Sequence, residues 1–389
     1  MRHTPWLTTA ILMFGCAQGG PGEVPPVDVA VGAAAPAPAS SDGGAPPGTP
    51  DAGFRACDPL IAAGEGVRIS DTGSCPGVMP GPADCAADLT LCTGSIQENG
   101  TTVAGATSDG RGSLVLSCHR ADVGPPVVNL LFLPTPSGFV SKAGLGVDVK
   151  PLSDGFVASD GSYFLPPPRY DFLAHDGDLR AAQTGGTLFA SANRAVILRP
   201  ADGQLIAQSF TADGALVSSA VVGSYAGPAS SLMLGGAMNA DGATLVLWQV
   251  YGLATASARW LAADGSLSGS VFSIAGWSSS VPSTAALAGG AIAVAAEPPS
   301  GEPTVRWRGV IGLGETSERT APAWLASRSG FFLLPGGKAM AFGTEILAPD
   351  GTICGTVDLG APLLGVGLDG TAFAARSLRT FRVYPRLFP

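Results

Sequence analysis

The stretch Trp260-Leu261-Ala262-Ala263-Asp264-Gly265-Ser266-Leu267 decides the fold, because it places an Asp-Gly pair between two apolar runs. Asp-Gly between alternating apolar residues is the strongest short-range signal for a β-hairpin, and the type I′ turn that it favours needs positive φ at both central residues. The same phrase recurs around Asp176, Asp213 and Asp350. We therefore expect a hairpin with a type I′ turn at all four positions.

The phrase returns at intervals of about 40 to 50 residues, once Gly312-Leu313-Gly314 is counted as a degenerate copy. The recurrence of Ala258-Arg259-Trp260 as Val305-Arg306-Trp307 supports that alignment. Such a period, with about four short strands per unit, is typical of a β-propeller. We predict an all-β protein with a β-propeller of seven blades, with six or eight as the alternative numbers and a pair of β-sandwiches as the competing fold.

The repeat divides most of the chain into six units that each hold a complete blade. These units cover residues 101–145, 147–184, 186–222, 229–275, 283–320 and 323–359. The remainder, 361–385, holds only three strands, so a seventh blade needs an outer strand from elsewhere. We expect residues 89–97 to supply that strand, which closes the ring from the opposite end of the chain.

The composition agrees with a β-protein and excludes some partners. Charged residues make up 13% of the chain, about half of the usual ~25%. Glutamate and lysine, which favour helices, are scarce, whereas aspartate and glycine, which favour turns, are abundant. The net charge of −9 leaves no basic stripe, so we expect no nucleic-acid partner. Glycine pairs lack the lysine of a phosphate-binding loop, and we predict no cofactor.

Cys16 closes the sequence Leu12-Met13-Phe14-Gly15-Cys16, after an apolar run from residue 6 that is too short to span a bilayer. With Arg2 as its basic start, this arrangement resembles the signal peptide of bacterial lipoproteins. The resemblance implies cleavage before Cys16, a membrane anchor of acyl chains such as palmitate, and, because Ala17 follows, a place at the outer membrane. The residues at 13 and 14 depart from the usual pattern, so an unanchored secreted or periplasmic protein is the alternative.

Four segments follow from these patterns. They are a signal peptide (1–15), a disordered tether rich in Pro, Gly and Ala (16–55), a Cys-rich cap with the closing strand (56–98), and the β-propeller (99–389). In architecture alone, the signal peptide and residues 89–389 resemble bacterial propeller lipoproteins of the cell envelope.

Six cysteines remain after Cys16, an even number that predicts three disulfides in an exported chain. They are Cys57, Cys75, Cys85, Cys92, Cys118 and Cys354. No pair has the spacing of a zinc site, so we predict no metal. We expect Cys354, which is remote in sequence, to tie the two ends of the propeller domain together; the full connectivity stays open.

Catalytic chemistry has little support in the sequence. Only His119 and His175 follow the signal, and no nucleophile elbow of the form G-x-S-x-G is present. We interpret His175 as a turn residue beside Asp176, and His119 as a packed or surface residue, so no catalytic residue is assigned. The alternative enzyme, a polysaccharide lyase or glycosidase, would draw its channel carboxylates from Asp148, Asp154, Asp160 and Asp171.

Three residues are candidates for binding. Trp277 has no counterpart in the repeat and lies in a Ser-rich connection, where an exposed ring can stack on a sugar or anchor a protein. Arg306 and Arg308 flank Trp307 and can bind an anion. The favoured hypothesis is therefore a surface-tethered module that binds an envelope protein or a glycan through propeller loops.

Overall fold

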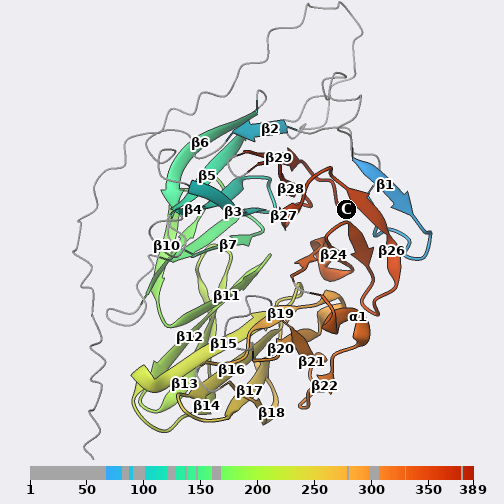
Figure 1. Cartoon of the computed structure of the whole chain (residues 1–389). Coiled ribbons are helices and arrows are strands. Elements are labelled where there is room, and N and C mark those ends of the chain that lie inside the picture. Colours follow the sequence, from blue (N-terminus) through green and yellow to red (C-terminus); the bar gives the residue numbers. More distant parts are fainter. Residues whose placement is uncertain are drawn as a thin grey trace, which may run out of the picture.

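The computed structural model describes residues 67–80, 87–90, 101–120, 128–135, 138–145, 148–159, 168–277, 280–297, 306–328, 330–377 and 380–389. Within these residues the strands form seven antiparallel sheets, which follow one another around a ring (Figure 1). The protein is a seven-bladed β-propeller, as the repeat predicts.

The first four blades are continuous in sequence. Blade one is β3 (Thr101–Ser108), β4 (Leu114–Arg120), β5 (Val128–Thr135) and β6 (Gly138–Leu145); blade two is β7 (Asp148–Leu152), β8 (Gly155–Ser159), β9 (Arg169–Leu173) and β10 (Leu179–Thr184); blade three is β11 (Thr187–Ser191), β12 (Arg194–Ala201), β13 (Gln204–Thr211) and β14 (Leu216–Ser224); blade four is β15 (Leu232–Met238), β16 (Thr244–Val250), β17 (Thr255–Leu261) and β18 (Leu267–Ala275).

The last three blades have shorter strands, and two of them receive strands from the N-terminal side. Blade five is β19 (Thr284–Ala286), β20 (Ile292–Ala295), β21 (Trp307–Ile311) and β22 (Arg319–Thr320); blade six is β23 (Phe332–Leu333), β24 (Met340–Phe342), β25 (Glu345–Leu347), β26 (Ile353–Asp358) and β1 (Arg68–Asp71); blade seven is β27 (Leu363–Val366), β28 (Ala372–Ala375), β29 (Thr380–Tyr384) and β2 (Ala87–Thr90). Among the described residues, the helices are α1 (Ala323–Ala326) and 3₁₀ turns at Ala229–Ser231, Ala288–Gly290 and Pro335–Gly337.

Burial explains the hydropathy of the strands. The second strand of a blade is covered on both faces by its neighbours, so β16 is an apolar run whose residues are buried almost throughout. The outer strand β14 has an exposed face, and half-buried and exposed residues alternate along much of it. The core is accordingly a series of apolar layers between successive blades, such as the layer centred on Trp260.

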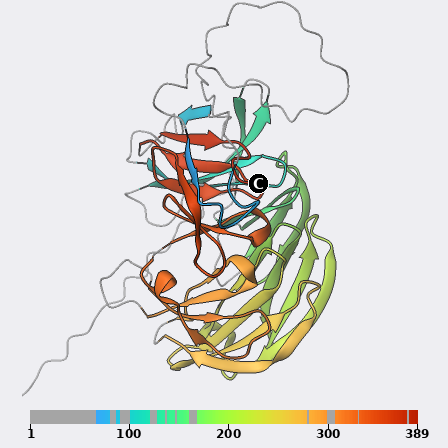
Figure 2. The same cartoon turned by 90° about the vertical axis from the view of Figure 1, so that its right-hand side faces the viewer.

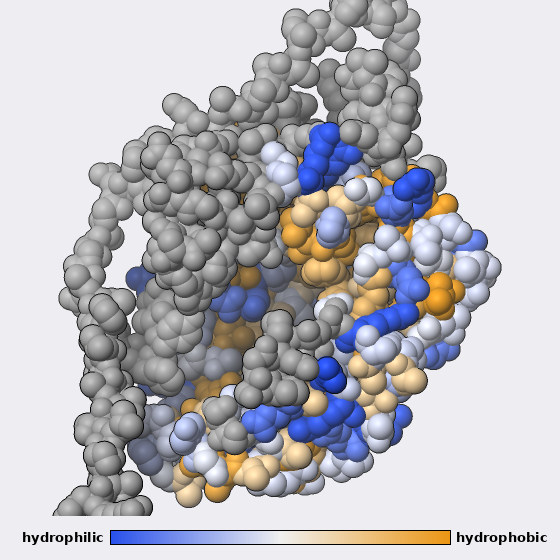
Figure 3. Space-filling view, viewed as in Figure 1, coloured by the Kyte–Doolittle hydropathy of each residue, from blue (hydrophilic) through white to orange (hydrophobic). Residues whose placement is uncertain are grey.

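The antiparallel order gives the ring two faces. We call the face that carries the turns between the first and second strands, and between the third and fourth strands, the turn face. The opposite face carries the turns between the second and third strands and the connections between blades, and we call it the connection face. On the side of the molecule shown in Figure 3, hydrophilic and hydrophobic areas are interspersed.

The Asp-Gly hairpins are present, but their turn type differs from the prediction. The N–H of Gly265 donates to the carbonyl of Ala262 (2.8 Å), and the N–H of Ala262 donates to that of Ser266 (2.8 Å), which defines a three-residue loop. Only the glycine has positive φ (82°), and the aspartate does not. The prediction of type I′ turns here was wrong, because the aspartate side chain stabilises the wider loop by accepting the N–H of Ser266 (2.9 Å).

The glycine of these outer turns also packs against the preceding blade. A Cβ on Gly214 would lie 2.6 Å from Cβ of Ala181 in blade two, and a Cβ on Gly265 would lie 2.4 Å from Oγ of Ser209 in blade three. The repeated glycine is therefore required twice, once for the left-handed backbone and once for the close approach of successive blades.

The ring closes with a strand from the N-terminal side, as predicted. β2 pairs antiparallel with β29, and Ala87 lies opposite Val383. The strand covers 87–90, whereas the prediction placed it at 89–97, of which residues 91–97 lie outside the described part of the chain. The fourth strand of blade seven thus comes from a segment that precedes blade one.

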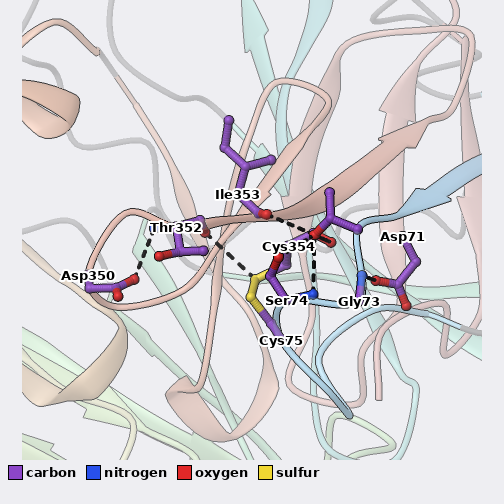
Figure 4. The surroundings of a disulfide bond; sticks show 9 residues. Asp71, Gly73, Ser74, Cys75, Asp350, Thr352, Ile353 and Cys354 are labelled. Atoms are coloured by element: carbon purple, nitrogen blue, oxygen red, sulfur yellow. Dashed lines mark hydrogen bonds between the residues drawn. A yellow bond between two sulfur atoms is a disulfide. The ribbon is translucent and has the colours of Figure 1, made fainter.

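Blade six carries a fifth strand that the repeat does not predict. β1 pairs with β26, and it lies alongside the orange strands of blade six in Figure 2. The disulfide between Cys75 and Cys354 fixes this segment to the blade, with the two Cα atoms 5.1 Å apart. Figure 4 shows the surroundings of this disulfide. The Thr72 hydroxyl donates to the carbonyl of Cys354 (2.8 Å), so covalent and polar contacts together hold the segment.

Several sequence predictions concern residues outside the described part of the chain. These are the signal peptide with Cys16, the tether, Cys57, Cys85, Cys92 and Asp160, together with the side chains of Cys118 and His119. Among the described residues, no helix has the length and apolar character to cross a membrane.

Candidate functional site

A protruding apolar turn marks the connection face of blade four. It joins β16 to β17, and its Tyr251 and Leu253 side chains are 66% and 52% exposed. Gly252 has a φ of 85°, and the N–H of Leu253 donates to the carbonyl of Val250 (3.1 Å), which closes a tight β-turn. An exposed tyrosine on a defined turn is typical of a protein-binding surface, because tyrosine is enriched among the residues that contribute most to binding.

A buried amide holds this turn in place. Gln249 is only 2% exposed, and its Nε2 atom donates to the carbonyl of Leu253 and to that of Trp277 (2.6 Å). The N–H of Gly276 also donates to the carbonyl of Ala254 (2.8 Å). The turn and the connection from blade four to blade five are therefore fixed to each other by hydrogen bonds.

Trp277 lies beside this turn and is half-buried, whereas the sequence prompted us to consider it exposed. Its side chain packs against the apolar layer between blades five and six. Its indole N–H is buried without a hydrogen-bond partner among the described residues. The side chain therefore makes a structural contact, and its buried indole N–H has no acceptor among the described residues.

The two candidate arginines have different environments. The Nε atom of Arg308 lies 2.8 Å from Oε1 of Glu318, and its Nη2 atom donates to the carbonyl of Ala275 (2.5 Å). Arg308 is therefore engaged by a carboxylate and braces the strand that leads to Trp277. Arg306 is exposed at the start of β21, on the connection face. We call Tyr251, Leu253, Trp277 and Arg306 the connection-face patch.

A second cluster, on the turn face, joins blades one and two. Nη1 of Arg111 lies 3.0 Å from Oδ1 of Asp154, and Nη2 of Arg180 lies 2.6 Å from its Oδ2. These arginines, Arg180 first, hold the pKa of the Asp154 carboxyl below its usual range. Nδ1 of His175 lies 3.2 Å from Nη1 of Arg111. The sequence alone did not indicate this cluster, because its members come from three separate turns and a strand.

His175 lies in a hairpin turn, as interpreted, but one residue later than expected, because the N–H of Gly177 donates to the carbonyl of Ala174, which is the first residue of the turn. The neighbouring Asp176 accepts the backbone N–H of Asp178 (3.1 Å), which gives that aspartate the turn-stabilising role expected of it. The cluster with Arg111 adds a contact between blades to this role.

Asp109 is a fully buried carboxyl next to this cluster. Its Oδ1 atom accepts the backbone N–H groups of Arg111 (3.0 Å) and Ser113 (2.8 Å), while Oδ2 has no partner among the described residues. The pKa of the Asp109 carboxyl is raised to about 7. Burial is the main cause, and the carboxylates of Asp369 and Asp154 add to it, whereas the two backbone hydrogen bonds lower the pKa. The carboxyl therefore keeps its proton in mildly acidic solution.

Of the carboxylates proposed for the alternative enzyme, the three in the described part of the chain, Asp148, Asp154 and Asp171, do not form one site. Asp148 pairs with Lys150 (3.0 Å), and Asp171 pairs with Arg169 (2.7 Å). Asp148 begins β7 and Asp154 follows its end, so a five-residue strand of about 16 Å separates these two residues. Among the described residues, no group of three His, Cys, Asp or Glu side chains could hold a metal ion.

Comparisons with known proteins add the following. No protein-family model and no curated protein matches this sequence. Among solved structures, a hydrazine synthase from Kuenenia stuttgartiensis is 11% identical, with a TM-score of 0.43 over 70% of this chain and 92% of that one. The Dos1 propeller is 8% identical, with a TM-score of 0.38 over 74% and 78%. A prolyl endopeptidase is 12% identical, with a TM-score of 0.43 over 70% and 44%. At these values the likeness carries no information about activity or ligand.

Proposed function

We propose that this protein is a lipoprotein of the cell envelope whose propeller binds a protein or a glycan through the connection-face patch. The observation that carries the binding role is the pair of exposed apolar side chains, Tyr251 and Leu253, on a turn that the buried Gln249 amide holds in place. A preorganised turn loses little conformational entropy on binding, so its exposed side chains contribute efficiently to affinity. Arg306 adds an exposed cation at the neighbouring blade.

The membrane anchor rests on the sequence around Cys16. Cells that express the full-length protein are grown with an alkyne-tagged fatty acid, and the protein is then isolated and tested for the tag. We expect labelling that the Cys16→Ser variant loses. Equal labelling of the variant, or no labelling of either protein, would count against the anchor.

The binding role is tested by photo-crosslinking on intact cells. A photoreactive residue replaces Ala254, which is exposed beside the patch, and in a control protein it replaces Leu313, which is 55% exposed on the turn face. We expect a defined adduct from position 254 only. It should disappear when Tyr251→Ser and Leu253→Ser are added, because loss of a central aromatic anchor costs about 2 kcal/mol or more, roughly 30-fold in affinity.

The outcomes separate the two ligand classes. A single protein adduct identifies a protein partner. A glycan ligand is identified by binding of the purified protein to immobilised envelope polysaccharide that the same double variant abolishes. Equal adducts from positions 254 and 313, or adducts and glycan binding that survive the double variant, contradict a role for the patch.

A further inference from the structure

A cavity opens on the turn face where the first turns of blades four, five and six meet. Its volume is about 360 Å³, within the range of small-molecule sites. Four glycines line it, two from blade five and two from blade six, together with one carboxylate and one ammonium group. They are Gly289, Gly290, Gly336, Gly337, Asp241 and Lys338.

The glycines keep the cavity open, because they contribute only backbone atoms to its wall. All four have positive φ, between 65° and 86°, which L side chains rarely adopt. A Cβ on Gly337 would lie 2.6 Å from Cβ of Ala240, so the turns of blades six and four touch at this point. A Cβ on Gly336, in contrast, would meet nothing within 4 Å. A ligand can therefore approach the backbone closely beside Gly336.

The two charged groups come from blades four and six, on either side of blade five. Asp241 lies in the first turn of blade four and Lys338 follows the corresponding turn of blade six, and both are exposed. No ion pair involves either residue within the described part of the chain. The other lysine–aspartate pair on the turn face behaves differently, because Nζ of Lys142 lies 3.2 Å from Oδ1 of Asp178 and the two charges neutralise each other.

We propose that this cavity binds a small zwitterion, namely a free amino acid or a short peptide. The ammonium group of the ligand lies at Asp241, its carboxylate lies at Lys338, and its backbone rests on the glycine wall. Opposite charges that line one cavity without pairing select a ligand that carries both charges. The inference goes beyond the proposed function and does not depend on it, since the cavity and the connection-face patch lie on opposite faces.

The test uses the full-length protein and ligand-observed NMR. The probes are the dipeptide Ala-Ala, its N-acetyl derivative, which lacks the ammonium group, and its amide, which lacks the carboxylate. We expect Ala-Ala to bind about two- to fivefold more tightly than either derivative, the range expected for exposed charge pairs. The Lys338→Gln protein should bind Ala-Ala and its amide equally, because the partner of the carboxylate is gone. The Asp241→Asn protein should bind Ala-Ala and its N-acetyl derivative equally, because the partner of the ammonium group is gone. Lys142→Gln is the control with a lysine outside the cavity.

A second pair of variants tests the location without removing a charge. Gly336→Asn places a side chain in the open space, and asparagine tolerates the φ of 68°. Gly343→Asn in the same blade has comparable backbone geometry and open space, but it lies on the connection face. We expect only Gly336→Asn to weaken Ala-Ala binding. Undetectable Ala-Ala binding to the unaltered protein, equal binding of all three probes, or equal losses in the matched variants would overturn the proposal.

Discussion

Replacement of Asp109 by asparagine should make the protein more stable at neutral and alkaline pH. Blade four already has an asparagine, Asn239, at the equivalent position of its first turn. There Oδ1 accepts the N–H of Ala243 (2.9 Å), and Nδ2 donates to the carbonyl of Gly290 in the next blade (3.4 Å). Asp109 reproduces the accepting half of this arrangement but needs a proton to donate.

The magnitude follows from the pKa. The pKa of Asp109 is about 7 in the folded state and 3.8 in its ordinary state, so between these values the folded protein binds a proton that the unfolded chain has lost. A rise in pH therefore favours the unfolded state by about 1.4 kcal/mol per pH unit in this window. Across the whole window the loss is about 4 kcal/mol. Asp109→Asn keeps a neutral donor at every pH and removes this dependence.

Urea unfolding followed by tryptophan fluorescence at pH 4, 6 and 8 measures the effect. The difference in unfolding free energy between Asp109→Asn and the unaltered protein should be below about 1 kcal/mol at pH 4 and should grow to about 4 kcal/mol at pH 8. Carboxyls whose pKa is lowered on folding, such as Asp154, act in the opposite direction, but they are common to both proteins and cancel. The reciprocal variant Asn239→Asp should acquire the same pH dependence. A difference that stays constant from pH 4 to pH 8 would refute the reasoning.

Three further outcomes are expected. Cys75→Ser should lower the unfolding free energy by about 2–4 kcal/mol, because the bond to Cys354 closes a very long loop; Cys354→Ser should match it, and an unchanged urea midpoint in either variant would contradict this. Gln249→Met should cost about 1–3 kcal/mol and speed hydrogen exchange in peptides from 250–277, since two carbonyls lose their donor; unaltered exchange there would argue against the role of the amide. Gly214→Ala should destabilise the protein by about 1–3 kcal/mol more than Gly252→Ala, because both have φ near 85° but only the first contacts the preceding blade; equal losses would mean that the turn alone requires glycine.

The blade repeat could be predicted from the sequence because blades two, three, four and six contain the same short pattern around an Asp-Gly pair. Asp264-Gly265 marks an outer turn between two strands, and the neighbouring glycine-flanked apolar runs mark second strands that are buried on both faces. The turn type, in contrast, could not be predicted from the sequence. A two-residue and a three-residue loop both accept Asp-Gly, and the choice depends on strand pairing. Asp202, at φ 49°, is one of two non-glycine residues with positive φ in the described part of the chain, and its turn is the two-residue form.

The closing strand was predictable by counting, but the fifth strand of blade six was not. Three strands in 361–385 leave an edge that needs a partner, and this indicates an added strand. Blade six is already complete with β26, so nothing in its own sequence calls for β1. The pairing of Arg68 with Asp358 depends on where the folded ring places the segment that precedes blade one, and this position is a property of the assembled fold.

The candidate sites were predicted only in part, and the two faces of the ring explain why. On the turn face, the outer-turn glycines of blades three and four pack against the preceding blade, so their positions repeat and can be recognised in sequence. The connection face carries segments that each differ from blade to blade. Trp277 was noticed because it breaks the repeat, whereas Tyr251 belongs to an ordinary four-residue turn and became visible only through its exposure. Residues that do not pack between blades are available for binding, and for the same reason they do not follow the sequence repeat.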